Sequence, residues 1–257
     1  GSGGDDPLFT WEYDQIPWMH ALNPELDWAA LEDLYLSTPL GLVVMDNFFS
    51  EEAMEIILDE IRQSTVLFDS RPGYAGAYLG EGLNSPLLMQ VAEEMAERFP
   101  RLLGPGGPAG KLVQGWVYAY PGNTGETCRD GIQVHADTAI LNLNIWLTPT
   151  EANLGSVEGG DGGGLVVYKS LAPEEWEFME FNQGQERIYG FLDGSPEGRD
   201  NVTVALRQNR AVMFNSDAFH ESAAYRLRPG FENTRINLTL LFGKREDLLA
   251  QRSAAAA

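Results

Sequence analysis

The sequence predicts a mainly β protein, a sandwich or jelly roll, with a mixed helical part at its N-terminus. After Gly104-Pro105-Gly106-Gly107-Pro108, most apolar runs are short and separated by Gly, Pro and Asn, which is typical of strands joined by turns. The chain has 257 residues, 44% hydrophobic and 11% aromatic, so it can bury a full core without staples. All-β domains often use this whole length. We therefore expect one domain over residues 5–250, and interpret 1–4 and 254–257 as tag or tail residues.

Residues 5–104 are expected to buttress the β domain, mostly with helices. Ser50 is a favourable N-cap, because its hydroxyl can accept a backbone N–H of the first turn, and two glutamates follow at the positive end of that helix. Pro86 can open another helix, and apolar residues then recur at near-helical spacing. The expected elements are helices at 27–35, 51–63 and 86–99, a buried strand at 41–45, and a loop at 69–85 rich in Gly, Tyr and Ser.

Residues 105–245 are expected to form the β core. One helical insert is expected at about 173–181. The regular appearance of short apolar runs favours two packed sheets. The candidate strands are 111–120, 132–136, 139–148, 164–168, 187–192, 201–206, 210–215 and 234–242.

Two of these strands alternate between polar and apolar residues. In 140–147, Asn142 and Asn144 share a face with Trp146, and Leu and Ile occupy the other face. In 235–242, Arg235 and Asn237 share a face in the same way. Such a polar row faces water on an ordinary sheet, but in a barrel it can line a wet cavity. The alternation alone leaves both interpretations open.

Charge and cysteine content exclude several classes of function. With 17 Lys and Arg against 38 Asp and Glu, the net charge is −21, which argues against nucleic acid or anionic membranes as partners. No apolar run reaches the length of a membrane span, and no signal segment is recognisable. The single cysteine, Cys128, excludes an internal disulfide framework and fits a reducing compartment. We therefore expect a cytoplasmic protein; its oligomeric state is not predicted.

Two of the three histidines occur in a pattern that can bind a metal ion. His135 and Asp137 are two residues apart, so on an extended segment both point to the same side. His220 comes much later, after a strand and a polar turn. Two His and one carboxylate form the facial set of non-haem Fe(II) oxygenases, although a short His-x-Asp motif alone is weak evidence. The third, His20, is interpreted as a surface or packing residue.

Arg235 could bind a carboxylate. It stands on a predicted strand with Asn237 two residues later, and a guanidinium can hold a carboxylate with two parallel hydrogen bonds. A single Arg on a strand is more commonly exposed or ion-paired, so this feature also needs support from its context.

These motifs occur in an order that resembles the Fe(II)/2-oxoglutarate-dependent dioxygenase superfamily over about residues 111–243. His-x-Asp, a distal His and Arg-x-Asn on a late strand match its pattern. Trp116-Val117-Tyr118-Ala119-Tyr120-Pro121-Gly122-Asn123 resembles the tyrosine-bearing strand and turn of its prolyl-hydroxylase-like and phytanoyl-hydroxylase-like branches. Gly162-Gly163-Gly164-Leu165-Val166-Val167-Tyr168 resembles their Gly-Gly-x-Leu strand.

The resemblance implies a double-stranded β-helix, which is a cupin-like jelly roll, with the site at its open end. It implies that His135, Asp137 and His220 bind Fe(II) and that Arg235 binds 2-oxoglutarate. The reaction would use O2 and release succinate and CO2 while it oxidises a substrate C–H, most simply by hydroxylation of an amino-acid-like, peptidyl or small natural-product substrate. The supporting cofactor contacts that it implies are Asn237, Asn144, Asn142, Tyr118 and Tyr120.

Two departures from the family pattern bear on these roles. The segment Arg228-Pro229-Gly230-Phe231-Glu232-Asn233 lengthens the gap from His220 to Arg235, so Arg226 or Arg228 is an alternative partner for the carboxylate. Related halogenases lack the carboxylate ligand, so Asp137 favours hydroxylation over halogenation.

Other side chains have less specific interpretations. Trp116, Trp146, Arg71 and Tyr74 are candidate substrate contacts, with core packing or an ordinary surface loop as the alternatives. Two other functions remain open. The protein could be a non-catalytic jelly-roll scaffold or sensor that binds a metal or ligand, or a Zn-dependent hydrolase that uses the same three metal ligands.

Overall fold

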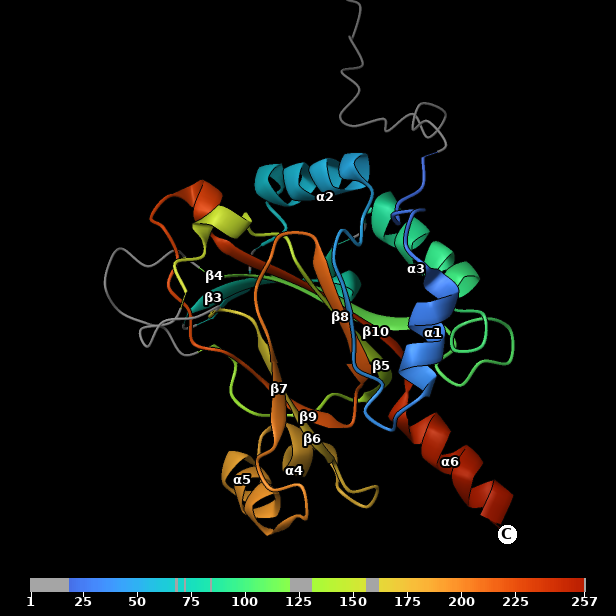
Figure 1. Ribbon diagram of the computed structural model, residues 1–257. Helices are drawn as coiled ribbons and strands as arrows, with labels where there is room; N and C mark the ends of the chain where they lie inside the picture. Colours follow the sequence, from blue (N-terminus) through green and yellow to red (C-terminus); the bar gives the residue numbers. More distant parts are fainter. Residues whose placement is uncertain are drawn as a thin grey trace, which may run out of the picture.

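Two antiparallel sheets form the body of the protein, as the computed structural model shows for residues 19–67, 69–71, 73–83, 85–120, 131–155 and 162–256 (Figure 1). The large sheet has the order β1-β8-β5-β10-β4-β3-β2, and the small sheet has the order β7-β6-β9. The prediction of a mainly β jelly roll is therefore confirmed. The strands are β1 Val43–Met45, β2 Asp69–Arg71, β3 Tyr74–Tyr78, β4 Leu112–Tyr120, β5 Ala139–Trp146, β6 Leu165–Leu171, β7 Asn201–Val204, β8 Arg210–Asn215, β9 Ala218–Ser222 and β10 Arg235–Lys244.

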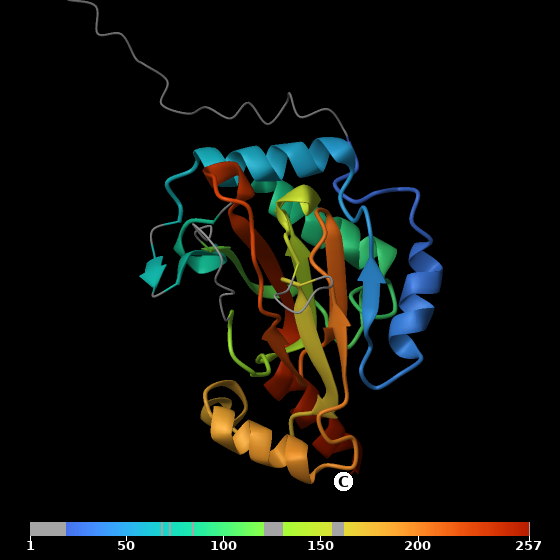
Figure 2. The same ribbon diagram turned by 60° about the vertical axis from the view of Figure 1, so that its left-hand side comes forward.

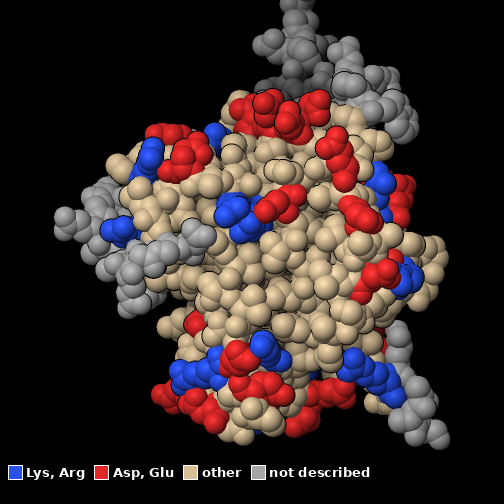
Figure 3. Space-filling view, in the orientation of Figure 1, with Lys and Arg blue, Asp and Glu red and all other residues tan. Residues whose placement is uncertain are grey.

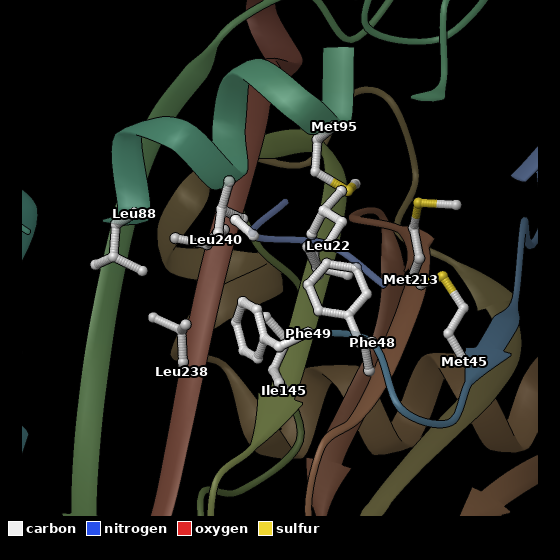
Figure 4. Close-up of a cluster of buried hydrophobic side chains, with 14 of the residues drawn as sticks. Leu22, Met45, Phe48, Phe49, Leu88, Met95, Ile145, Met213, Leu238 and Leu240 are labelled. Atoms are coloured by element: carbon white, nitrogen blue, oxygen red, sulfur yellow. The ribbon is translucent and has the colours of Figure 1, made fainter. Parts of the chain in front are cut away.

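The outer face of the large sheet is covered by the N-terminal helices. Side chains of α2 and α3 pack with the leucine and isoleucine rows of β5 and β10 in one apolar core. Figure 4 shows part of this core, with Leu88 and Met95 of α3 beside residues of β5 and β10. Ser50 caps α2 by accepting from the backbone N–H of Ala53, as its position in the sequence predicts. The helices are α1 Trp28–Leu36, α2 Glu51–Gln63, α3 Pro86–Arg98, α4 Phe178–Asn182, α5 Gln185–Gly194 and α6 Arg245–Ala256, with single 3-10 turns η2 Leu79–Glu81, η3 Thr150–Ala152 and η4 Phe231–Asn233.

The small sheet is covered on its outer face by α4 and α5. Phe181 of α4 and Ile188 and Leu192 of α5 pack against Tyr168 and Phe219 of the sheet. Both ribbon views place these two helices at the end of the molecule opposite α2 (Figures 1 and 2). A second apolar cluster, which includes Trp146, fills part of the space between the two sheets. The polar rows of β5 and β10 face that same interior, so neither face of these strands meets bulk water.

Four local predictions were wrong. Residues 187–192 lie in helix α5, because Ile188 and Leu192 are one helical turn apart and both are buried on one face. Residues 69–85 contain β2, β3 and η2, since this Gly- and Tyr-rich segment pairs with the free edge of β4. Residues 132–136 make a single bridge, between His135 and His220, and no strand. In the 173–181 insert, the helix begins only at Phe178 and ends at Asn182.

None of the helices in the described ranges is long and apolar enough to cross a membrane.

Candidate metal centre and its cavity

Two chain segments bring the three predicted metal ligands together. The backbone N–H of His135 donates to the carbonyl of His220 at 3.0 Å, and the N–H of His220 donates back at 2.8 Å, so the two histidines lie directly opposite each other. Their ring centroids are 4.2 Å apart. The Nε2 atoms of His135 and His220 lie 3.9 and 3.5 Å from the carboxylate oxygens of Asp137. One ligand atom from each residue lies within 4.8 Å of the other two, which is close enough to hold one ion.

The backbone fixes which nitrogen each imidazole offers. His135 Nδ1 lies 2.8 Å from the carbonyl of Gln133, and His220 Nδ1 lies 3.0 Å from the carbonyl of Ala218. A carbonyl can only accept, so Nδ1 carries the proton and Nε2 keeps its lone pair for a metal. Burial lowers the pKa of His135 to about 4, and the neighbouring His220 adds to this effect. The ring of His135 is therefore neutral at ordinary pH, as a metal ligand must be.

A chain of amide hydrogen bonds leads to the third ligand, Asp137. Asn142 donates to a carboxylate oxygen of Asp137 at 2.6 Å, and the Asn142 oxygen accepts from Asn144 at 2.5 Å. The Asn144 oxygen accepts in turn from Asn237 at 2.9 Å and from Thr239 at 3.0 Å. Burial, the largest single influence, raises the pKa of Asp137, but the neighbouring imidazoles of His220 and His135 and the hydrogen bond from Asn142 together lower it below its ordinary value. Asp137 is thus held as a carboxylate.

Arg235 lies deep beside this centre, with 2% of its surface exposed. Its Nε donates to the carbonyl of Gly163 at 3.2 Å, and its guanidinium carbon lies 4.7 Å from the ring centroid of Tyr120 and 5.3 Å from that of Tyr225. No carboxylate within the described ranges forms an ion pair with it. A buried guanidinium without a carboxylate partner suits an anionic ligand.

The metal ligands and Arg235 line one small cavity of about 30 Å³, which we call the inner cavity. A larger outer cavity of about 480 Å³ adjoins it, and both cavities are lined by Trp116, Tyr118, Tyr120, Ile132, His135 and Asp137. The outer cavity extends between β3 on one side and α4 on the other. The geometry therefore provides a metal set and a buried cation at the bottom of a pocket that opens to the surface.

The predicted site residues are divided between this cavity and other places. Asn144, Asn237, Tyr118, Tyr120 and Trp116 line the inner cavity, and Tyr74 lines the outer one. Asn142 lines neither cavity but donates a hydrogen bond to the carboxylate of Asp137. Trp146 is fully buried in the apolar cluster between the sheets and lines neither cavity.

The alternative and minor candidates lie apart from both cavities. Arg71 is on the surface, with its Nε hydrogen-bonded to Asp69. Arg226 donates to the carbonyl of Leu154, Arg228 is exposed, and neither lines a cavity around the metal ligands. His20 is exposed. Cys128 and the Pro121-Gly122-Asn123 turn lie outside the described residues.

Several residues around the site were not predicted. Thr239 follows Asn237 in the polar row of β10, so the alternation places it on the same face, but no site role was predicted for it. Tyr78, Phe178, Asn182 and Gln185 line the outer cavity but have no motif in the sequence. Only the folding of β3 and α4 towards the His-x-Asp segment brings them there.

Comparison with known proteins identifies the fold. No protein-family model and no curated protein sequence matches the chain. Among solved structures, the non-haem α-ketoglutarate-dependent epimerase SnoN, in complex with Fe3+, α-ketoglutarate and nogalamycin RO, is similar with a TM-score of 0.57 and 17% identity over 85% of each chain. A 2OG-Fe(II) oxygenase family oxidoreductase from Burkholderia pseudomallei matches with a TM-score of 0.51 and 13% identity, over 86% of this chain and 91% of that one.

A prolyl-4-hydroxylase from Pseudomonas putida is also similar, with a TM-score of 0.50 and 15% identity over 87% of this chain and 97% of that chain. These solved structures belong to 2-oxoglutarate oxygenases. Each alignment covers most of this chain and most of the other chain. The resemblance inferred from the motifs is thus confirmed for the fold: the chain has the jelly-roll fold of the 2-oxoglutarate- and Fe(II)-dependent oxygenases.

Proposed function

We propose that the protein is an Fe(II)- and 2-oxoglutarate-dependent oxygenase that hydroxylates a C–H of an amino-acid-like, peptidyl or small natural-product substrate. One observation carries the proposal: His135, Asp137 and His220 share a cavity with Arg235, a buried cation that has no carboxylate partner within the described ranges. A zinc hydrolase or a metal-binding scaffold has no need for that cation.

The three ligands fit Fe(II) by their chemistry. Two imidazole nitrogens and one carboxylate oxygen are its characteristic donors in non-haem oxygenases, and they leave positions open for other ligands. The carbonyls of Gln133 and Ala218 orient the two imidazoles, and Asn142 orients the carboxylate. When bound, Fe(II) would supply the activation of O2 that oxidises the substrate C–H while 2-oxoglutarate is converted to succinate and CO2.

Arg235 would bind the carboxylate of 2-oxoglutarate that lies away from the metal. Tyr120 has a pKa raised to about 12, mainly by burial, so it is a neutral phenol that can donate a hydrogen bond to the same carboxylate. The inner cavity has about 30 Å³, which is about the volume of one water molecule. Binding of 2-oxoglutarate must therefore draw on the adjoining outer cavity, so we expect the half-buried Tyr118, which lines both, to move when it binds.

The presence of Asp137 favours hydroxylation over halogenation, because the carboxylate occupies the position that a halide would need. The similar structures include an epimerase and a prolyl hydroxylase, so the mass of the product is the decisive measurement for the reaction. Hydroxylation adds the mass of one oxygen, whereas epimerisation leaves the mass unchanged.

The test is anaerobic addition of Fe(II) and 2-oxoglutarate to metal-free protein while the visible metal-to-ligand charge-transfer band is recorded. We expect the band in the wild type, its loss in His135→Ala and a weaker band at the same 2-oxoglutarate concentration in Arg235→Ala. His20→Ala and Arg228→Ala are matched controls, since both residues are exposed and outside the cavities.

Substrates are then sought by succinate release and product mass. A wild-type protein without the band and without metal-dependent binding of 2-oxoglutarate would contradict the proposal. Activity with Zn²⁺ in the absence of O2 would favour a hydrolase instead.

A further inference from the structure

We infer that the outer cavity selects a neutral or cationic, ring-bearing small molecule and rejects an anionic one. The inference rests on the proposed function, because it assigns the substrate class of the same site. Three observations carry it: the aromatic wall of the cavity, the absence of basic side chains from its described lining, and two glutamine amides on its rim that form no hydrogen bond within the described residues.

The aromatic wall is built around Tyr118 of β4. The ring centroid of Tyr118 lies 4.5 Å from that of Tyr74, 5.8 Å from that of Trp116 in a stacked arrangement, and 6.0 Å from that of Tyr78. All four rings are half-buried, so each has part of its surface open to the cavity. Aromatic faces bind flat rings by stacking and bind cations through the ring quadrupole.

A glycine in β3 makes room for this wall. Gly76 lies opposite Tyr118 in the β3–β4 pairing. A Cβ atom at position 76 would lie 3.2 Å from Cε1 of Tyr118 and 3.2 Å from the hydroxyl of Tyr78. The missing side chain therefore leaves room for both rings close to the backbone of β3.

The charge of the cavity favours neutral or positive ligands. Neither Lys nor Arg occurs among the described residues that line it, and its carboxylate, Asp137, belongs to the metal set. The nearby Arg71 forms its ion pair with Asp69, which also accepts from the hydroxyl of Tyr78. Burial raises the pKa of Tyr118 and of Tyr78 above the usual value, so these phenols stay neutral. An anionic group held against this wall, away from Arg235 of the inner cavity, would lose hydration without gaining a cationic partner from the described lining of the outer cavity.

The opposite rim can recognise uncharged polar groups. Phe178 and Asn182 of α4 face the aromatic wall across the cavity, together with Gln185 and Gln133. Within the described part of the chain, no hydrogen bond uses the side-chain amides of Gln133 and Gln185. Asn182 donates to the carbonyl of Ala136, the residue between two metal ligands, at 2.9 Å. A suitable ligand would place a ring against the aromatic wall and hydroxyl, amide or amine groups against the amides of the opposite rim.

Three probes that share an indole ring and differ in charge test the inference. Tryptamine is cationic, indole-3-ethanol is neutral and indole-3-propionate is anionic. Each is titrated by calorimetry into protein loaded with Ni(II) and 2-oxoglutarate. We expect the first two to bind at least about 10-fold more tightly than the third, because only the third carries an anion that must be desolvated.

Variants locate the binding. Tyr74→Ala and Phe178→Ala should each weaken the binding of tryptamine about 3- to 10-fold, through loss of ring contact. Phe178 is 45% exposed, so its replacement leaves the core intact if Tyr74→Ala folds poorly. Met179→Ala is the matched control, because Met179 is 61% exposed on the same helix and does not line the cavity.

Equal or tighter binding of indole-3-propionate, no binding of any probe, or equal effects of Phe178→Ala and Met179→Ala would overturn the inference. The Fe(II) charge-transfer band is recorded on the same preparations. A normal band with the wrong order of probes rejects only the substrate class. The expected order of probes without a band rejects the proposed function and leaves the ring-binding cavity in place.

Discussion

Asn142 fixes the carboxylate of Asp137, which we propose as a metal ligand, although Asn142 lines neither cavity. It is fully buried, donates to Asp137 and is itself held by Asn144. Hydrogen bonds to a metal ligand fix its rotamer and the direction of its lone pairs. Asn142 is thus a positioning residue, and its replacement should change metal binding more than it changes the fold.

We expect Asn142→Leu to weaken Ni(II) or Fe(II) binding about 10- to 100-fold, which is the usual effect of removing a partner of a metal ligand. Calorimetric titration of the metal-free protein measures the change, and circular dichroism confirms that the variant folds. Asn201→Leu, on the exposed edge strand β7, is the control and should bind metal as the wild type does. Unchanged affinity in Asn142→Leu would show that Asp137 holds its orientation without this amide.

The residues of the site differ in how far the sequence could predict them. The order of His-x-Asp, distal His and Arg-x-Asn indicated the metal set and Arg235, and the structure brings them to one cavity. Alternation placed Asn142, Asn144 and Trp146 on one face, but it gives the face of a strand and not the position along it. At the far end of β5 that interior face meets apolar side chains, so Trp146 packs in the core.

At the scale of elements, a bidentate ion pair between Asp46 and Arg210 joins β1 to β8. Both carboxylate oxygens of Asp46, just after β1, accept from Arg210 at the start of β8. The hydrogen bond from Arg210 is the main cause that lowers the pKa of Asp46 below its ordinary value of 3.8. A carboxylate with a lowered pKa stabilises the folded state above its unfolded pKa, and this contribution is lost as the pH falls through the folded pKa.

Asp46→Asn should therefore reduce the free energy of unfolding at pH 7 by about 0.5–1 kcal/mol, a small effect because the pair is partly exposed and screened by solvent. The difference from the wild type should shrink as the pH falls below about 4, where the wild-type carboxylate also becomes protonated. Urea unfolding at pH 3–7 measures it. Asp59→Asn, on the exposed face of α2, is the control. A difference that does not change with pH would exclude Asp46 ionisation as the source.

A buried carboxylate attaches the first described residues to α3. Glu94 is 8% exposed and accepts the backbone N–H groups of Ala21 and Leu22 at 2.8 and 2.9 Å. Glu94→Ala leaves two buried donors without a partner, so we expect it to lower the free energy of unfolding by about 2–4 kcal/mol. Denaturant titration against Glu97→Ala, an exposed position on the same helix, checks this. Equal stability of the two variants would contradict it.

Helices with caps and long periodic faces were predictable, whereas short elements depended on tertiary contacts. Ser50 and Pro86 indicated the starts of α2 and α3 directly. The short, mostly apolar segment 187–192 is compatible with a strand or a helix, and its packing against Phe219 and Trp176 determines that it forms helix α5. The β2–β3 hairpin lacks apolar alternation, because its Gly and Tyr residues fit against the edge of β4 and the outer cavity.

At the scale of the whole molecule, the negative charge is spread over the exterior, and the candidate site keeps a buried positive charge. Figure 3 shows acidic side chains gathered at the end where α2 lies, and Glu51, Glu52, Glu55 and Asp59 of this helix are exposed. Arg235, in contrast, is almost completely buried. The composition predicted the acidic exterior, but only the packing of the two sheets could show that Arg235 is buried without a carboxylate partner among the described residues.

The candidate site connects the layers of the jelly roll. His220 belongs to the small sheet, Arg235 belongs to the large sheet, and His135 bridges to His220 from the segment that leads into β5. A ligand pair that binds these residues binds only the folded state, in which the layers are together. By linkage, ligands at about 100 times their dissociation constants should stabilise the fold by about 2.7 kcal/mol.

We therefore expect Ni(II) with 2-oxoglutarate to raise the melting temperature by roughly 5–10 °C for a chain of this size, and EDTA to reverse the rise. His220→Ala should lose most of the shift, because it removes a metal ligand, whereas His20→Ala, which changes an exposed histidine, should keep it. Scanning calorimetry with and without the ligands measures each case. Both variants remove one imidazole. Non-specific binding of the metal to surface histidines therefore predicts a loss in His20→Ala, whereas binding at His135, Asp137 and His220 predicts a loss confined to His220→Ala.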